Sequence, residues 1–324
     1  MATELIGIAG MTPELKQTYD RRLLSVAEMS YVFMKYGEKR PIPAKGGKSI
    51  EFRRFERITI TAGSYTLTEG TPPTETQATI SSVAGTISQY GMFSRLSDVL
   101  LTQSFDPVLA EYTDRYGEAM AEGLDVVVRN ALSSFTTLQY ADSATVVGTS
   151  GAGAVGSGNY LDAAELQEMK RTLARVGARP IVDGKFVCLI HPDNTHDLFQ
   201  DPDIVNSFEL AAPRSEANPM FTGRMGDWQG ITFVETRNLR LRASYGMSGA
   251  DIYEVIMLGK EAYGLSELSA LSAQLIVKPL GSGGTSDPLN QVSTVGWKAA
   301  LAATILNNSF AGIIYCASSR SNAA

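Results

Sequence analysis

The most regular pattern in the chain is helical and begins after Asp106 and Pro107. Asp106 is a favoured N-cap residue, and Pro107 suits the first helical position because its missing N–H is not needed there. Apolar side chains then recur every three or four residues, and charged residues fill most other positions. The apolar positions are Leu109, Tyr112, Tyr116, Met120, Leu124, Val127, Ala131 and Phe135. The pattern predicts a helix about 45 Å long that lies with one side along a sheet or surface.

Residues 49–94 alternate in steps of two, which is typical of β-strands. Ile50 and Phe52 belong to a first run, and a second run leads through Val83 and Ile87 to Phe93. The stretch between the runs is rich in threonine and has little to bury. Because an isolated two-stranded hairpin is marginally stable in water, we expect this one to lie on its own core or on a neighbouring subunit.

A glycine- and serine-rich segment at 148–159 separates the long helix from a region in which helix and strand patterns alternate. The helical spacing that starts at Leu161 ends at Gly177, a favoured C-terminal cap. Asn307-Asn308-Ser309 lies between the last two strand patterns and favours a hairpin. The predicted strands are 186–190, 231–234, 252–258, 275–277, 292–306 and 310–317.

The composition is that of a folded protein with little material for catalysis. The chain has 324 residues, of which 44% are hydrophobic, and this length suggests about two domains. Two histidines and two cysteines leave little room for acid–base or metal chemistry and make no disulfide framework. The first residues lack a secretion-signal pattern, and no uninterrupted apolar run reaches the ~18 residues of a membrane span.

The net charge of −6 is unevenly distributed. Residues 16–57 hold 11 basic and five acidic residues, a net charge of +6, so the remainder carries −12. Residues 58–135 hold nine acidic residues against three arginines. This is either ordinary variation or a basic arm that lies on an acidic partner surface, where complementary charge fixes the register. A net acidic chain is a poor general binder of nucleic acid.

Two segments carry candidate chemistry. Gly151 to Gly156 matches the G-x-G-x-x-G pattern, but the strand before it is short and no helix opens on the third glycine, so a flexible loop fits better. His191, Asp193, His196 and Asp197 lie close together, yet a metal site needs a further firm ligand, and a helix start capped by Asp193 is the simpler interpretation. Serine-nucleophile and P-loop motifs are absent. We expect no catalytic, cofactor-binding or metal-binding residue.

The C-terminal part of the chain carries a family resemblance. Its most specific pieces are Asp287-Pro288-Leu289-Asn290-Gln291 and Thr294-Val295-Gly296-Trp297-Lys298. Together with Ile276 to Gly281 and Leu258 to Gly264, these segments resemble the major capsid proteins of tailed bacteriophages, specifically of the podovirus N-four type. The order of arm, threonine-rich hairpin, long helix, α/β domain and closing strands is similar over nearly the whole chain.

The resemblance implies an α+β chain with the Hong Kong 97-like capsid fold. The implied parts are an N-terminal arm (1–40), an extended β-hairpin loop or E-loop (41–94), a peripheral domain (95–149 and 266–324) with a long spine helix at 104–136, and an α/β axial domain (150–265). A thin hairpin, an overlong one-sided helix and a charged arm are poorly buried in a monomer. They would be well buried between subunits.

The resemblance also implies function. The chain would be a major capsid protein, not an enzyme, that self-assembles as hexamers and pentamers into an icosahedral phage head around double-stranded DNA, which it binds without sequence specificity. It would reside in the virion, and in the host cytoplasm during assembly, without contacting a membrane. Expected partners are a portal, an optional decoration protein and a separate scaffolding protein, because an arm that begins near residue 1 leaves no room for a built-in scaffolding segment.

Contacts between subunits are expected at charged residues of the E-loop, the spine helix and the C-terminal strands, and at one tryptophan. These residues are Arg53, Arg54, Arg57, Glu69, Glu75, Arg95, Glu111, Asp114, Glu118, Lys278, Asp287 and Trp297. Some relatives crosslink subunits through an E-loop lysine, but no lysine occurs between Lys48 and Lys170, so we expect a non-covalent shell. Two alternatives remain open: an encapsulin-like cellular compartment of the same fold, and a nucleotide-dependent enzyme that uses Gly151 to Gly156.

Overall fold

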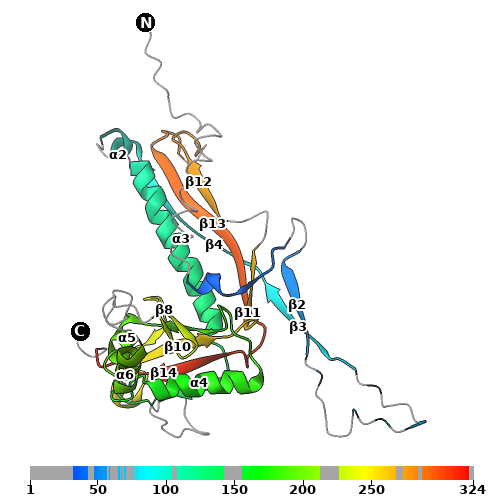
Figure 1. Ribbon diagram of the computed structural model, residues 1–324. Coiled ribbons are helices and arrows are strands. Elements are labelled where there is room, and N and C mark those ends of the chain that lie inside the picture. Colours follow the sequence, from blue (N-terminus) through cyan, green and yellow to red (C-terminus); the bar gives the residue numbers. More distant parts are fainter. Residues whose placement is uncertain are drawn as a thin grey trace.

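The chain is described by a computed structural model. The described residues are 32–42, 47–56, 58, 65, 67, 69–70, 75, 77–103, 108–141, 155–211, 226–267, 273–283 and 287–320. Within them, a long helix and a narrow sheet run side by side (Figure 1). A broader sheet with helices lies at one end of this pair, and a two-stranded ribbon projects from the side of the narrow sheet.

The broader, axial sheet has seven strands in the order β5-β14-β10-β6-β8-β7, with β9 beside β10. These strands are β5 (Leu138–Tyr140), β6 (Phe186–Ile190), β7 (Asp227–Trp228), β8 (Ile231–Glu235), β9 (Leu241–Arg242), β10 (Ile252–Leu258) and β14 (Ala311–Cys316). Every residue of β6, β10 and β14 is buried. A strand that is buried on both faces needs a continuous apolar run, and this is why β6 and β10 match their predicted bounds.

Three helices belong to this axial part: α4 (Ala163–Val176), α5 (Pro192–Leu198) and α6 (Pro202–Ala211). Asp162 caps α4 by accepting hydrogen bonds from the backbone N–H groups of Ala164 and Glu165, and Gly177 ends the helix in the left-handed conformation. The cap of α5 differs from the prediction. His191 is its N-cap and accepts from the Asp193 N–H at 3.2 Å.

The spine helix is α3 (Val108–Leu132), which follows the short helix α2 (Asp98–Gln103). Residues 104–107, where the predicted spine helix begins, lie outside the described residues. The helix ends before residue 136 because the hydroxyls of Ser133 and Ser134 bond to carbonyls of the last turn. Its apolar stripe, including Met120 and Leu124, is buried.

The narrow, peripheral sheet has five strands, with β13 at its centre. They are β1 (Glu38–Lys39), β4 (Ser88–Ser97), β11 (Tyr263–Glu267), β12 (Gln274–Lys278) and β13 (Val292–Ile305). One edge of β13 pairs with β4. The other edge pairs with β12 along residues 294–298 and with β11 along residues 301–305, and β1 pairs with the free edge of β11. The spine helix packs on β13, as Figure 1 shows.

The predicted C-terminal hairpin is wrong. Asn307-Asn308-Ser309 leads from β13 in the peripheral sheet to β14, which pairs with β10 and β5 in the axial sheet. Because every residue of β14 is buried, this strand needs a sheet with two covered faces. The resemblance places residues 138–140 and 311–316 in the peripheral domain, but in the structure both segments are axial strands.

The E-loop begins as an antiparallel ribbon of β2 (Ser49–Phe55) and β3 (Ile80–Thr86). The second predicted strand run does not continue to Phe93 in the ribbon, because the chain passes at Ile87 from β3 into β4 of the peripheral sheet. Ile87 is buried there with Ile42, Ala300 and Ala302. This small cluster anchors the root of the ribbon on the sheet.

Candidate subunit interface

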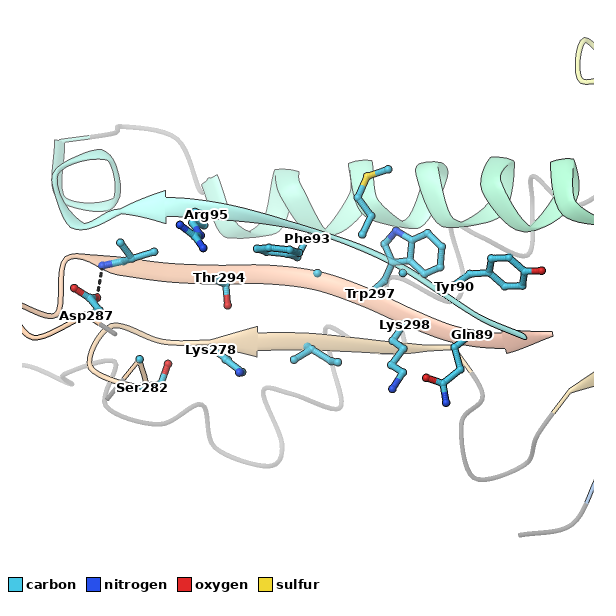
Figure 2. A pocket seen from close by; sticks show the side chains of 16 residues that line it. Gln89, Tyr90, Phe93, Arg95, Lys278, Ser282, Asp287, Thr294, Trp297 and Lys298 are labelled. Carbon is cyan, nitrogen blue, oxygen red and sulfur yellow. Dashed lines mark hydrogen bonds between the residues drawn. The ribbon is translucent and has the colours of Figure 1, made fainter. Parts of the chain in front are cut away.

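The peripheral sheet has one covered face and one largely open face. Val295 and Trp297 of β13 are buried with the spine helix, and Figure 2 shows the Trp297 indole on the side of α3. Thr294, Gly296 and Lys298 alternate with them and therefore belong to the opposite face. At this part of the opposite face, residues of β4, β12 and β13 and of the loop before β13 line a groove of about 750 Å³.

An apolar strip crosses the middle of this open face. Gly296 pairs with Phe93 on β4 and with Ile276 on β12, so these three residues lie side by side across three strands. Phe93 is 64% exposed and Ile276 is 41% exposed. A Cβ at Gly296 would lie 2.6 Å from the Met92 carbonyl oxygen and 2.7 Å from the Phe93 Cβ. The glycine therefore keeps the groove hollow between two exposed apolar side chains.

Positive charge flanks the apolar strip on both sides. Arg95 and Lys278 pair with Thr294 in the next row of the sheet, and Lys298 lies in the row on the other side of Gly296. The acidic residue of the groove, Asp287, accepts a hydrogen bond from the backbone N–H group of Val292 at 2.8 Å (Figure 2). It also accepts one from the backbone N–H group of Gln291 at 3.1 Å. The open face thus suits a segment that carries apolar and acidic side chains.

The E-loop has these properties. Its sequence between Arg57 and Arg95 contains no basic residue and two acidic ones, Glu69 and Glu75. Both glutamates are exposed. Among the described residues near them, Tyr65 is 70% exposed and Leu67 is 72% exposed.

The structure brings together some of the predicted contact residues. Arg95, Lys278 and Asp287 line the groove. Trp297 lies at the same place in the sheet but is only 6% exposed, and its ring packs beside Gly123 of its own spine helix. Trp297 is therefore a core residue of the subunit.

The remaining predicted residues lie elsewhere. Arg53 and Arg54 are on β2, where they pair with Glu51 at 3.1 Å and Glu56 at 3.3 Å. Arg57 lies outside the described residues. On the spine helix, Glu111 and Glu118 are exposed and Asp114 is half-buried.

Phe93, Ile276 and Lys298 were missed as interface candidates by the sequence reasoning. The alternation of exposed and buried residues along β12 was a possible signal, since Ile276 stands between the better-buried Leu275 and Val277. An apolar run of three residues reads equally well as a strand buried on both faces.

The segment from His191 to Asp197 makes hydrogen bonds with other parts of the chain. The hydroxyl of Tyr253 donates to Asp193 at 2.6 Å, and burial lowers the pKa of the neighbouring His191. Burial raises the pKa of the Cys188 thiol to about 12, which keeps the thiol unreactive at neutral pH. Among the described residues, no group of three or more His, Cys, Asp or Glu is placed to bind a metal ion.

The described end of the glycine-rich motif does not open a helix. Gly151 to Ala154 lie outside the described residues. Gly156 leads into a turn, in which its N–H donates to the Asn159 side chain at 2.6 Å, and α4 begins only at Ala163. A phosphate-binding loop needs its helix to start at the motif. No helix among the described residues is long and apolar enough to cross a membrane.

A sequence profile described as "Phage capsid protein" matches residues 80–315, well over half of the chain. The chain belongs to this phage capsid protein family. It is therefore a structural protein of the virion capsid whose copies assemble into a shell, and not an enzyme. The resemblance given by the C-terminal segments is confirmed.

Solved capsid structures share the fold of this capsid protein. The cyanophage Pam1 capsid protein is 18% identical with a TM-score of 0.66, over 84% of this chain and 86% of that chain. The capsid protein of Ralstonia phage GP4 is 16% identical with a TM-score of 0.68, over 88% of both chains. These likenesses confirm the predicted Hong Kong 97-like fold. A search of curated proteins with the sequence finds no match.

Proposed function

We propose that this capsid protein assembles as hexamers and pentamers into the icosahedral head of a tailed phage, with double-stranded DNA inside. The observation that carries the proposal is the open face of the peripheral sheet. Phe93 and Ile276 are exposed at its centre, and a continuous exposed apolar patch on a well-formed sheet is typical of a contact surface. A second copy of the chain would complete the packing that one copy leaves unfinished.

The segment that we propose for this surface is the E-loop of the neighbouring copy. Tyr65 and Leu67 would contact the apolar strip, and Glu69 and Glu75 would lie near Arg95 and the lysines of the groove. The ribbon that carries the E-loop projects away from the spine helix and the peripheral sheet (Figure 1). A contact between two different surfaces of the same chain is head-to-tail, and such contacts close into rings when the rotation allows.

A second proposed contact joins opposite charges. Arg53 and Arg54 lie toward the end of the β2–β3 ribbon that is away from Ile87, and they are basic, as is Arg57. Glu111, Asp114 and Glu118 are acidic residues of the spine helix. We place these two surfaces opposite each other in neighbouring subunits. Exposed ion pairs contribute little affinity, so this contact would set the register between subunits.

We further propose that a portal, a separate scaffolding protein and an optional decoration protein take part in the host cytoplasm during assembly. This rests on the resemblance to tailed-phage capsid proteins. The DNA would be enclosed without sequence-specific contacts, in keeping with the net charge of −6. Phosphate binding requires clustered positive charge.

The test is charge reversal with rescue. Arg95→Glu with Lys278→Glu should reduce the yield of particles at least tenfold, counted by electron microscopy and sedimentation, because like charges would face the E-loop glutamates. Adding Glu69→Lys and Glu75→Lys should restore particles. The matched control, Arg95→Lys with Lys278→Arg, keeps the charges and should assemble. Normal assembly of the reversed variant would overturn the E-loop contact, and a soluble monomer that is stabilised by a nucleotide would overturn the shell.

An encapsulin-like compartment is the weaker alternative. The chain has a TM-score of 0.52 and 12% identity with a virus-like particle from Pyrococcus furiosus, over 93% of this chain and 99% of that chain. That likeness concerns the fold alone, whereas the family match is to phage capsid proteins. Nuclease-resistant DNA in purified particles would support the head, and an enzyme cargo without DNA would support the compartment.

A further inference from the structure

The described end of the N-terminal arm is attached to the spine helix through buried residues. A short 3-10 helix, η1 (Phe33–Lys35), packs against α3. Phe33 and Met34 are buried in the main hydrophobic core. The strand β1 follows after Gly37 and pairs with β11. Phe33 and Met34 are therefore core residues, and the segment 32–39 contacts both the spine helix and the peripheral sheet.

The carboxylate of Asp125 caps this short helix from the spine helix. Asp125 is fully buried. Its Oδ1 accepts hydrogen bonds from the backbone N–H groups of Phe33 at 2.8 Å, Val32 at 3.3 Å and Met34 at 3.4 Å. The first N–H groups of a helix have no partner within it, and Val32, the N-cap residue, makes no side-chain cap of its own. A residue about 90 positions away therefore supplies the cap.

A second polar contact closes the same junction from β11. The Tyr263 hydroxyl donates to the carbonyl oxygen of Phe33. The Tyr263 ring fills the space beside Gly37, where a Cβ would lie 2.6 Å from the ring. The carbonyl and the N–H of Phe33 are thus both held by buried side chains, one from the sheet and one from the helix.

Among the described residues, little positive charge lies close to the carboxylate of Asp125. No ion pair between described residues includes it, and its hydrogen-bond donors are backbone N–H groups and the Asn238 side chain. The ionisable groups around it are Arg129 on the spine helix, whose guanidinium donates to the Asn238 carbonyl at 3.0 Å, and the phenols of Tyr36 and Tyr263. Beyond Arg129 lie Arg240 and Glu254. Burial of a carboxylate without a bound cation favours its neutral form.

We propose that Asp125 is a pH-sensitive anchor, which seats residues 32–39 on the spine helix and holds them more firmly when its carboxyl group is protonated. The neutral carboxyl keeps a carbonyl oxygen that accepts the same N–H groups, and it costs less to bury than the anion. Burial raises the pKa of Asp125 to about 6, even though its backbone hydrogen bonds act in the opposite direction.

The direction of the pH effect follows from proton linkage. A carboxyl group that binds its proton near pH 6 when seated, and near pH 4 when exposed to water, takes up a proton on seating between these values. The stabilisation is fully present below about pH 4 and is lost as the pH rises through about 6. Between pH 7.5 and pH 5 the seating equilibrium should strengthen about tenfold.

The test measures hydrogen exchange by mass spectrometry on the full-length chain at pH 7.5 and pH 5. Each rate is corrected for the intrinsic pH dependence of exchange, and a β10 peptide reports any global change. In the unmodified chain, protection of residues 32–36 should rise about tenfold at pH 5. Asp125→Asn mimics the neutral carboxyl, so protection should be high and insensitive to pH. Asp125→Ala leaves three N–H groups without a partner and should lose most of the protection at both pH values.

The matched control is Asp162→Asn, which changes the exposed carboxylate that caps α4 and should leave residues 32–36 unchanged. Protection that stays constant or falls at pH 5 in the unmodified chain would overturn the proposal. An equal rise in Asp125→Asn would assign the pH effect to another group and would also overturn it. If Asp125→Ala does not fold, the comparison of Asp125→Asn with the unmodified chain decides.

Discussion

The two sheets of this capsid protein are buried in different ways. In the axial sheet, neighbouring residues of one strand belong to two cores: Leu189 lies in the core shared with the spine helix, and Cys188 lies in the core under α4. In the peripheral sheet only one face is covered, and Phe93 and Ile276 are exposed on the other. The axial sheet is covered on both faces within one chain, whereas the open face of the peripheral sheet is where we propose that a second chain packs.

This difference separates folding from assembly. A sheet that is covered on both faces obtains its hydrophobic stabilisation when one chain folds. If the open face is the proposed contact, it obtains the same kind of stabilisation on association, and its side chains can be changed with little effect on the isolated subunit. The next three predictions test this separation.

The largest effect is expected from matched isoleucines in the two sheets. Ile256→Ala in β10 removes a fully buried side chain and should lower the free energy of unfolding by about 2–5 kcal/mol. Ile276→Ala on the open face should change it by less than about 0.5 kcal/mol but should reduce particle yield. Chemical denaturation of the unassembled chain and particle counts measure the two effects. If Ile276→Ala destabilised the isolated chain as much as Ile256→Ala, this would contradict the claim that Ile276 lies on a face that the isolated chain leaves uncovered.

A smaller effect is expected at a helix cap in the axial part. Asp162→Ala removes both side-chain hydrogen bonds to the start of α4, which should cost about 1 kcal/mol of unfolding free energy. The exposed Ser282 beside the groove is the control, and Ser282→Ala should leave the thermal unfolding of the subunit unchanged. A larger loss at Ser282 than at Asp162 would contradict the assignment of subunit stability to the axial part.

No covalent effect is expected at the subunit contact. Because the E-loop beyond Lys48 lies in a stretch without lysine that extends to Lys170, the tip of the loop has no amine to form an amide crosslink. Assembled particles that are boiled in detergent should therefore run as monomers on a gel. A ladder of covalent oligomers would contradict this prediction, because it would show that another covalent bond joins the subunits.

Features that depend on neighbouring residues could be predicted from the sequence, whereas features that depend on distant residues could not. The strands of Phe186–Ile190 and Ile252–Leu258 could be predicted to the residue because continuous apolar runs between polar ends have few alternatives. The turn at Asn307-Asn308-Ser309 was recognised, but its neighbours were wrongly paired. Turn chemistry is local, whereas the choice of sheet for β14 depends on which sheet offers two covered faces.

The residues of the candidate interface were likewise predictable from the sequence only in part. Arg95 and Lys278 could be named in advance as charged residues of the right region, and they proved to share one groove. Trp297 was named for its place in the resemblance, but alternation along β13 turns it to the spine helix. Phe93 could not be chosen from the pattern, because a strand residue with an apolar side chain is buried or exposed according to what packs on its face.

The chain's own pattern was therefore enough for the long helix, for the longer strands, for the end of α4 at Gly177, for the uneven charge and for the family. Those features depend on residues within a few positions of one another, or on composition. The open face with its apolar strip, and the capping of Phe33 by Asp125, arise from residues that are far apart in the chain. They appear only when packing has assigned each side chain to a face, because burial is a property of the assembled layers and not of the segment.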